Sequence, residues 1–459
     1  MLSNGSVDSP CMLEDLIKER LKKKDALEKL GLNVYPARVK RSHLVAHVVK
    51  EFSALSKKKT KVWLTGRLLG LRIQGGVAFA DLMDGSGGKI QIVLAKAKLP
   101  NFQTLKDNLD IGDFVEVSGP LFKTKKGERS VEAKTLRLIV KSIRPLPSVW
   151  HGLQDVEERF RKRYLDLLMN ADVREQLVQR SQIVEYLRHS LANEGFLEVE
   201  TPTLQAIPGG AKARPFKTHH NALDVDFYLR ISPELYLKRL LVGGLEKVFE
   251  LGKVFRNEGM DRDHNPEFTE LELYWAYQDY WSLMKFTQKL LKKLIPGKWS
   301  SVFFAEIFKK HTGKDYKSVP VDQLDEVFKK EVRPKIVEPT FVTDYPESVM
   351  PLAKLHQDDP SLTESFQLIV NGAEVVKGFS ELNDPVFQRE QMERQEKAFR
   401  EGDTESSRKD EDFLEALEYG MPPAAGLGIG IDRLVAIATK AHAVKEIILF
   451  PTLRPKNSD

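Results

Sequence analysis

The stretch GAEVVKGFSELND (372–384) contains three charged residues whose spacing could support chemistry. Glu374 and Glu381 lie seven residues apart around an apolar and aromatic centre, and Lys377 lies between them. The carboxylates could hold a metal ion or an organic cation, or the segment could be a strand end with solvated charges. Residues seven apart point to opposite faces of a regular strand. A bulge or twist near Gly378 is therefore needed if both carboxylates line one site.

An arginine at the end of an apolar strand is the second candidate. The segment KVFELGKVFRNEGMDRDHNPEFTELELYWAY (247–277) predicts two strands joined by a long charged loop, and Arg256 follows the first strand. A desolvated guanidinium without an anionic partner is very costly, so we expect Arg256 to contact an anion. Glu258 could be that anion, or a bound phosphate could.

A glycine-rich segment is the third candidate. In PPAAGLGIGIDRLVAIAT (422–439), glycines at every second position allow close approach of the backbone. The segment predicts a strand that runs into an apolar helix beginning at Asp432 and Arg433, and a helix start of this kind could bind an anion.

Other parts of the chain predict the elements that position these residues. Residues 174–194 predict a helix, and the segment GFLEVETPTL (195–204) after it predicts a short strand ended by Pro202. The polar segment 388–412 predicts an exposed helix followed by a loop.

Residues 61–144 predict five short strands separated by glycine-rich turns. This count fits an OB-type β-barrel, a fold that binds oligonucleotides on one face. Phe79, Arg72 and Gln91 would supply a stacking ring, a cation and a hydrogen-bonding amide, although a strand aromatic can equally belong to a core. Residues 12–30 predict a basic amphipathic helix that packs on its own domain and contacts nucleic acid.

Composition limits the class of protein. The 459 residues suffice for two or three domains, and 41% hydrophobic with 30% charged residues is typical of soluble globular proteins. No run of 18 apolar residues predicts a membrane span, and the polar first ten residues predict no signal peptide. The single cysteine, Cys11, excludes an intramolecular disulfide and a cysteine-rich zinc site. These features favour a cytoplasmic protein.

Charge is divided unevenly along the chain. Residues 1–150 contain 28 Lys and Arg against 15 Asp and Glu, which gives a net charge of +13. The remaining residues contain 43 basic and 51 acidic side chains, which gives −8. The basic first part could meet a polyanion, or it could be a solvated lysine-rich surface.

Together the segments 174–204, 247–277 and 422–439 resemble motifs 1, 2 and 3 of class II aminoacyl-tRNA synthetases, in the same order. The resemblance is closest to the lysyl-tRNA synthetase family and covers nearly the whole chain. The segments that carry it are RPLPSVWHGLQDVEERFRKRYLDL (144–167), PGGAKARPFKTHHNALDVDFYLRISPELYLKRLLVGG (208–244), FRNEG with HNPEFT and ELYWAY, GFSELND (378–384) and GLGIGIDR (426–433).

The resemblance implies an α+β chain. Residues 1–147 would form the basic helix and a five-stranded OB-type anticodon-binding barrel, and residues 148–459 a catalytic domain with an antiparallel sheet flanked by helices. The implied activity is lysine–tRNA ligation, in which ATP activates L-lysine to lysyl-adenylate and the lysyl group passes to tRNA(Lys). It also implies Mg²⁺ and a homodimer formed through motif 1.

The resemblance assigns ATP binding to Arg256, Glu258, His264, Asn265, Phe268, Glu374 and Arg433. Arg256 and Arg433 would be the catalytic residues, holding the α-phosphate with the attacking carboxylate and the γ-phosphate respectively. Glu258 would accept from the adenine amino group, and Phe268 would stack on the adenine.

Lysine binding is assigned by the resemblance to Gly210, Glu234, Glu272, Tyr274, Lys377, Phe379 and Glu381. Glu234 and the backbone of Gly210 would hold the α-amino group. The ε-ammonium would lie among Glu272, Tyr274 and Glu381, beside Phe379. Arg72, Phe79 and Gln91 lie where the family reads the anticodon.

The sequence departs from the family at several positions. The family has two acidic Mg²⁺ ligands seven residues apart; Glu374 is the second, but the first position is Gln367, which brings no charge. Lys377 replaces the usual asparagine near the substrate carboxylate, with which it could pair, or it could repel the α-ammonium. Thr135 replaces a glutamate used in anticodon reading, and the region 285–345 is shorter than usual.

Two other functions remain possible. A paralogue that lysylates a protein would usually lack the barrel, which this chain has. A non-catalytic RNA-binding protein on a decayed fold would tend to lose Arg256, Glu258 and Arg433, all of which are present.

Overall fold

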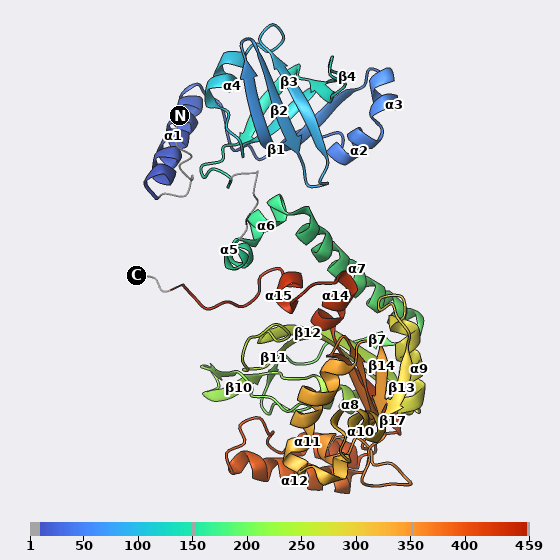
Figure 1. Cartoon of the computed structure of the whole chain (residues 1–459). Coiled ribbons are helices and arrows are strands. Elements are labelled where there is room, and N and C mark those ends of the chain that lie inside the picture. Colours follow the sequence, from blue (N-terminus) through green and yellow to red (C-terminus); the bar gives the residue numbers. More distant parts are fainter. Residues whose placement is uncertain (1–9, 148–152, 154, 351, 457–459) are drawn as a thin grey trace. The chain divides into compact units, whose positions relative to one another are not determined.

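The computed structural model describes residues 10–147, 153, 155–350 and 352–456, which form two compact units (Figure 1). The first unit runs to Arg159 and includes Leu168–Ala171, and the second contains Phe160–Leu167 and the chain from Asp172 onward. The predicted domain boundary at 147/148 and the predicted absence of a signal peptide concern residues that lie outside the described ones.

The first unit contains a closed β-barrel. Its strands are β1 (Lys61–Gln74), β2 (Val77–Met83), β3 (Lys89–Ala95), β4 (Phe114–Lys123), β5 (Arg129–Glu132) and β6 (Thr135–Val140), in the order β1-β2-β3-β5-β4-β6. Strand β1 also pairs with β4, which closes the barrel. The last predicted strand is divided into β5 and β6, because β5 bridges β3 and β4 whereas β6 pairs with β4 alone.

Helix α1 (Pro10–Lys29) is tied to the barrel by charged side chains, which agrees with the predicted helix. Arg20 donates to the carbonyl oxygens of Ser142 and Ile111, both at 3.0 Å. Lys23 lies 2.7 Å from Asp110, which also pairs with buried Lys141. The helices α2 (Val45–Lys50), α3 (Phe52–Lys57) and α4 (Phe102–Asn108) complete this unit.

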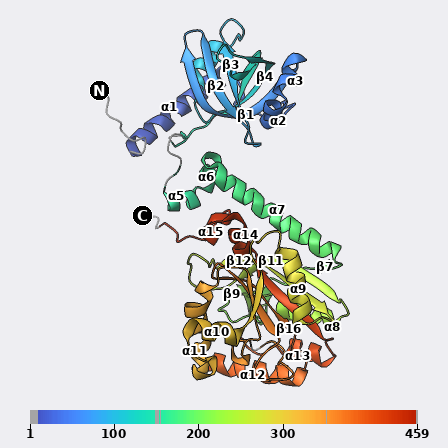
Figure 2. The ribbon, with the colours of Figure 1, turned by 45° about the vertical axis from the view of Figure 1, so that its right-hand side comes forward.

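The second unit is built on an eight-stranded sheet (Figure 2). Its strands, in spatial order, are β13 (Ser300–Phe303), β14 (Thr340–Thr343), β15 (Ser365–Val370), β16 (Ala373–Ser380), β17 (Ala424–Gly430), β12 (Glu267–Ala276), β11 (Lys247–Phe255) and β7 (Leu197–Glu198). The two outermost pairs, β13 with β14 and β7 with β11, are parallel and all other pairs are antiparallel. The predicted antiparallel sheet is thus confirmed.

One face of this sheet is apolar and packs against α7 (Ala171–Asn193), α9 (Tyr280–Leu291) and α14 (Ile431–Thr439). Its core includes Leu271, Leu273, Leu427 and Ile429, which alternate along β12 and β17 with the residues of the opposite face. Strict alternation in the sequence therefore separates a hydrophobic core from a polar surface on the same strands.

Helices also flank the polar face. Helices α8 (Glu234–Val242), α12 (Pro385–Arg400) and α13 (Glu411–Glu418) share an apolar cluster with Val248 and Tyr274, and α10 (Phe304–Thr312) and α11 (Val321–Val327) pack at the β13 end. Asp384 ends the GFSELND segment and caps α12 by accepting from the amides of Val386 and Phe387.

The remaining elements are short. They are α5 (Val156–Arg161), α6 (Arg163–Met169), α15 (Val444–Ile447), β8 (Leu204–Gln205), β9 (Lys217–His220), β10 (Val225–Leu229), the 3₁₀ turns η1 (Tyr316–Ser318), η3 (Arg333–Lys335) and η4 (Glu347–Val349), and the π-helical turn η2 (Phe328–Val332). Within the described part of the chain, no helix is long and apolar enough to span a membrane.

Candidate active site

A row of polar residues crosses the polar face of the large sheet. Gln367 on β15 is opposite Lys377 on β16, Lys377 is opposite Gly428 on β17, and Gly428 is opposite Glu272 on β12. Directly opposed residues on neighbouring strands point to the same face. Gly426, Gly428 and Gly430 all belong to this face, so β17 forms a floor of bare backbone beneath it.

The strand β16 carries the bulge that the spacing of Glu374 and Glu381 requires. Val376 pairs with Leu368, but Glu374 pairs with Ile369, so two residues of β16 oppose one step of β15. Val375 and Val376 consequently both enter the apolar core. The bulge therefore lies at Val375 rather than near Gly378, and it returns Glu374 to the polar face that Glu381 shares.

A buried lysine joins two of the predicted lysine-binding carboxylates. Lys238 of α8 has no exposed surface, and its Nζ lies 2.6 Å from Glu234 Oε1 and 2.5 Å from Glu381 Oε2. The same ammonium lies 5.6 Å from the centre of the Phe379 ring. The structure thus brings Glu234, Phe379 and Glu381 together, as predicted, around a cation of the protein itself.

The second oxygen of Glu381 faces the glycine floor. Oε1 is buried and has no hydrogen-bond partner among the described residues. A Cβ atom at Gly426 would overlap both this oxygen and the ring of Tyr274. Glycine at 426 therefore keeps open the space in which Glu381 could accept from a ligand.

Glu272 and Tyr274 form the next part of the pocket. Glu272 accepts a hydrogen bond of 2.7 Å from the Ser232 hydroxyl and one of 3.0 Å from the Tyr274 hydroxyl. Gly210 has φ of +86°, and a Cβ there would approach Ser232 Oγ and Glu234 Cβ to 2.8 Å. The backbone at Gly210 thus lies against Glu234, in agreement with the predicted grouping.

Burial makes these carboxyl groups hold protons more tightly. Burial, only partly offset by Lys238, raises the pKa of Glu381 to about 8. Burial and the neighbouring carboxylates Glu270 and Glu234 raise the pKa of Glu272 well above its usual value. A pocket with this excess of buried negative charge favours binding of a cation.

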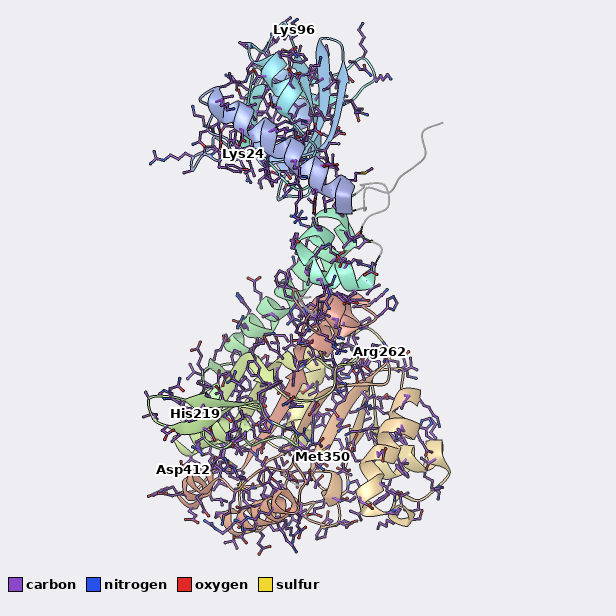
Figure 3. The ribbon with its side chains drawn as sticks, turned by 90° about the vertical axis from the view of Figure 1, so that its left-hand side faces the viewer. Lys24, Lys96, His219, Arg262, Met350 and Asp412 are labelled. Atoms are coloured by element: carbon purple, nitrogen blue, oxygen red, sulfur yellow. The ribbon has the colours of Figure 1, made fainter. Side chains whose placement is uncertain are left out.

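Arg256 lies at the predicted end of β11, but its anionic partner is Glu270. Its Nη2 lies 3.7 Å from Glu270 Oε2, and its guanidinium donates to the carbonyl of Ile231 at 3.3 Å. Glu258 is exposed and has no ion pair with any described residue, so Glu270 and not Glu258 is the carboxylate beside Arg256. Glu258 is exposed on the loop 256–266, whereas Glu270 lies on β12 opposite Gly252 of β11. Arg262 marks this loop in Figure 3.

Arg433, at the start of α14, contacts His264 and the backbone of Glu374. Its Nη2 lies 2.9 Å from His264 Nε2, and its Nη1 donates to the backbone oxygen of Glu374 at 3.1 Å. Because a guanidinium can only donate, His264 accepts at Nε2 and donates from Nδ1 to Asp261 at 2.8 Å. Arg433, His264 and Glu374 are therefore brought together, as predicted for a phosphate site.

The remaining predicted ATP residues lie near the two arginines. The Arg256 guanidinium carbon is 5.0 Å from the centre of the Phe268 ring, so this arginine covers part of the ring. Asn265 donates to the backbone oxygen of Glu267 at 2.6 Å, and its buried Oδ1 has no hydrogen-bond partner among the described residues.

The two residues predicted to hold Mg²⁺, Gln367 and Glu374, differ in the contacts that they make in the structure. Gln367 is buried, and its Oε1 already accepts a 2.9 Å hydrogen bond from the Tyr345 hydroxyl. Burial raises the pKa of Glu270, and the negative charge of nearby Glu374 raises it further. Arg256 and Arg433 act in the opposite direction on this pKa. Buried Glu270 Oε2 has no hydrogen bond to a described residue. Adjacent carboxylates with an unmatched oxygen fit a hard divalent cation.

Metal-binding clusters are otherwise absent from the described residues. No group of three or more His, Cys, Asp or Glu side chains in this part of the chain has the arrangement of a metal site.

The predicted nucleic-acid residues share the outer face of the barrel. Phe79 on β2 is opposite Arg72 on β1, and Gln91 on β3 is opposite Asp81 on β2. Buried Ala78, Ala80, Ile90 and Ile92 alternate with these residues, so Phe79 and Gln91 point away from the core. Gln91 Oε1 accepts from Ser130 at 3.0 Å, and its amide NH₂ group is left to face outward.

Three charged residues of the site, Lys377, Lys238 and Glu270, differ from what the sequence predicted or left open. The Lys377 side chain makes no hydrogen bond or ion pair with the described residues. Lys238 and Glu270 were not predicted. Lys238 follows Glu234 by four residues on a helix, and Glu270 alternates with Glu272 on a strand, so both had a detectable periodic signal.

Comparison with known proteins finds two families that match separate parts of the chain. A family described as "tRNA synthetases class II (D, K and N)" matches residues 155–454. A second family, "OB-fold nucleic acid binding domain", matches residues 62–146.

Curated relatives match over almost the whole chain. The lysine–tRNA ligase of Moorella thermoacetica is 43% identical over 96% of this chain and 98% of its own length. That of Carboxydothermus hydrogenoformans is 43% identical over 97% and 99%, and that of Roseiflexus sp. (strain RS-1) is 44% identical over 97% and 100%. With its OB-type barrel, glycine-floored carboxylate pocket and paired arginines, the chain belongs to the class II lysyl-tRNA synthetase family.

Proposed function

We propose that this protein is a lysine–tRNA ligase that uses ATP to activate L-lysine and transfers the lysyl group to tRNA(Lys). The observation that carries the proposal is the buried carboxylate pocket over the glycine floor, directly beside the two arginines Arg256 and Arg433. A cationic amino acid bound there would present its carboxylate to a nucleotide held by those arginines.

Lysine recognition follows from charge. Glu234, Glu272 and Glu381 would bring three negative charges when ionised, and Lys238 one positive charge, so the pocket matches two ammonium groups. The α-ammonium would bind Glu234 and the Gly210 backbone. The ε-ammonium would bind Glu272, Glu381 and the Tyr274 hydroxyl, next to Phe379. Amino acids without a side-chain ammonium would leave buried carboxylates unpaired and be rejected.

ATP would lie along the motif 2 loop. Arg256 would hold the α-phosphate and Arg433, with His264, the γ-phosphate, because permanently charged planar forks suit phosphate oxygens. Phe268 would stack on the adenine, Glu258 would accept from its amino group, and Asn265 would line the base region. A Mg²⁺ ion held by Glu374, with the Gln367 amide oxygen, would neutralise charge on the phosphates.

The reaction needs positioning more than covalent chemistry. A lysine carboxylate oxygen would attack the α-phosphorus, forming one P–O bond while the bond to the leaving pyrophosphate breaks. The terminal ribose hydroxyl of the tRNA would then attack the activated carbonyl and release AMP. Arg256 would stabilise the negative charge that develops on the α-phosphate, and the arrangement of bound groups would supply most of the rate.

The barrel and α7 support the partner assignments. Arg72, Phe79 and Gln91 would read unpaired anticodon bases by charge, stacking and hydrogen bonding. The motif 1 segment exposes the apolar residues Val178 and Leu197, which fits a homodimer interface. We propose the cytoplasm as the site of action, where tRNA is charged for protein synthesis.

Two assays test this function against its alternatives. Lysine-dependent ATP–pyrophosphate exchange measures adenylate formation, and transfer of radiolabelled lysine measures tRNA charging, both with Mg²⁺. Both activities are expected. Exchange without tRNA charging would favour a protein-lysylating paralogue, and absence of both would favour a non-catalytic RNA-binding protein.

A further inference from the structure

A positive charge is buried in the pocket where the substrate's own positive charges are expected. The Lys238 ammonium is completely shielded from solvent and lies 2.6 and 2.5 Å from the carboxylates of Glu234 and Glu381. Helix α8 supplies Lys238 and Glu234 one turn apart, and Glu381 follows β16. The cation thus links the helix to the strand that carries the substrate-facing residues.

Packing alone does not account for a lysine at this position. Transfer of an ammonium out of water costs several kcal/mol, roughly, even when it is paired, and well-packed apolar residues of similar volume are often as stable or more so. A methionine has nearly the same volume and could lie beside the same Phe379 ring. The charge therefore has a role that its volume does not supply.

The geometry divides the oxygens of Glu381 between two tasks. Neither oxygen has a hydrogen bond to the described residues. Oε2 lies 2.5 Å from the Lys238 ammonium as an ion pair, whereas Oε1 is buried on the side of Gly426 and Tyr274. The resident ammonium thereby fixes the rotation of this carboxylate and leaves one oxygen directed at the ligand space. Glu234 is held in the same way through its Oε1.

The resident charge also sets what the pocket can accept. Three carboxylates without Lys238 would exceed the two ammonium groups of free lysine by one negative charge. With Lys238 the charges balance, and neither a proton nor another cation has to accompany the substrate.

We propose that Lys238 is a positioning and specificity-determining residue, a resident ammonium that orients Glu234 and Glu381 and adjusts the pocket to an amino acid with two ammonium groups. The inference rests on the proposed lysine-activating function. It concerns substrate recognition and not the phosphate chemistry, so it predicts separate effects on the two substrates.

The test compares Lys238→Met with the matched control Lys247→Met. Lys247 also lies against aromatic rings, 4.5 Å from Trp275, and its Nζ donates to the Glu194 carbonyl oxygen, outside the pocket. Steady-state ATP–pyrophosphate exchange gives KM for lysine and for ATP, and thermal unfolding reports folding. Lys238→Met should raise the KM for lysine about tenfold or more while the KM for ATP stays within about twofold, since losing an ordered charge partner costs about 1.5–3 kcal/mol. The control should change neither constant.

Two further variants separate charge from packing. Lys238→Gln is also neutral but can donate to both carboxylates, and it serves if the methionine variant does not fold; it should show the same selective rise in KM for lysine. Lys238→Arg keeps the charge and should lie closer to the wild type than either neutral variant. An unchanged KM for lysine in both neutral variants, or equal rises in both KM values, would overturn the inference. Failure of the wild-type protein to exchange with lysine would instead refute the proposed function.

Discussion

Lys377 and Glu272 project from the same face of the sheet on either side of Gly428, which has no side chain to separate them. The three residues lie in one row across β16, β17 and β12. A cation and a carboxylate are thus held on either side of a strip of bare backbone, an arrangement that complements the two opposite charges of a zwitterion.

This arrangement predicts that Lys377 binds the substrate carboxylate. Lys377→Asn should raise the KM for lysine about tenfold, because a hydrogen bond to a charged group contributes about 1.5–3 kcal/mol. Lysine-dependent ATP–pyrophosphate exchange at fixed ATP measures the effect. If Lys377 instead repels the α-ammonium, the variant would have an unchanged or lower KM for lysine, and the assignment would be wrong.

Glu381 and Tyr274 lie so close to Gly426 that a side chain at this position of β17 should clash with them. Gly426→Ala places a methyl group against Glu381 and Tyr274, so the KM for lysine should rise at least about tenfold, with a loss of about 1–3 kcal/mol in the free energy of unfolding from overpacking. Gly430→Ala is the matched control, since its nearest neighbour would be Arg433 Cδ at 3.9 Å. Equal effects of both substitutions would contradict this account of the floor.

The raised pKa of Glu381, about 8, predicts that lysine binding depends on pH. Below this pH the free protein holds a proton on the carboxyl group, and the proton must leave before an ammonium can bind the ionised form. Affinity for lysine should therefore increase between about pH 6.5 and 8, by up to about tenfold per pH unit, and then level off. Calorimetry in buffers of different ionisation enthalpy should detect proton release on binding. Proton uptake, or affinity that falls over this range, would refute the prediction.

Replacing Gln367 by glutamate is expected to strengthen the proposed Mg²⁺ site, because the family has a negative charge at this position. Gln367→Glu adds a carboxylate near Glu374 and should increase affinity for a divalent cation about tenfold, because ligand charge governs the affinity of such sites. Mn²⁺ binding followed by electron paramagnetic resonance, in the presence of ATP, measures this directly. Without the cation the added like charge should lower the melting temperature. Unaltered Mn²⁺ affinity would exclude position 367 from the metal site.

Replacing Phe79 is expected to weaken tRNA binding and to leave adenylate formation unchanged. Stacking of a base on an aromatic ring contributes about 1–3 kcal/mol, so Phe79→Ala should raise the KM for tRNA about ten- to a hundredfold. ATP–pyrophosphate exchange is the internal control, because adenylate formation does not involve the barrel. A similar loss in both assays would indicate a folding defect and not a lost stacking contact.

The apolar pattern predicted the two strands of 247–277 around a charged loop, whereas the antiparallel sheet as a whole was implied by the resemblance to the family. The FTELELY segment places leucines on the core face and glutamates on the polar face, and motif 2 forms the predicted pair of strands around a charged loop. Residue identities alone therefore indicated which side of the sheet carries the chemistry.

Contacts between distant segments could not be predicted in the same way. An i,i+4 pair such as Glu234 and Lys238 is typical of solvated helix faces. Only the packing of α8 on β11 and β12, with the ion pair from Lys238 to Glu381, shows that it is buried. The pairing of Arg256 with Glu270 rather than Glu258 depends on how the loop turns. The bulge was expected from the spacing of Glu374 and Glu381, but its place at Val375 depends on which residue the core accepts.

The bulge at Val375 makes β16 tolerant of change in an unusual way. The extra residue lies between Glu374 and Lys377. The face to which Glu374 points is therefore set separately from that of Lys377, Phe379 and Glu381. Deleting Val375 should restore regular alternation with Glu374 still on the polar face, while Lys377, Phe379 and Glu381 keep their orientation. One strand thus contains two modules, and evolution or design could alter the metal-binding half without resetting the half that selects the amino acid.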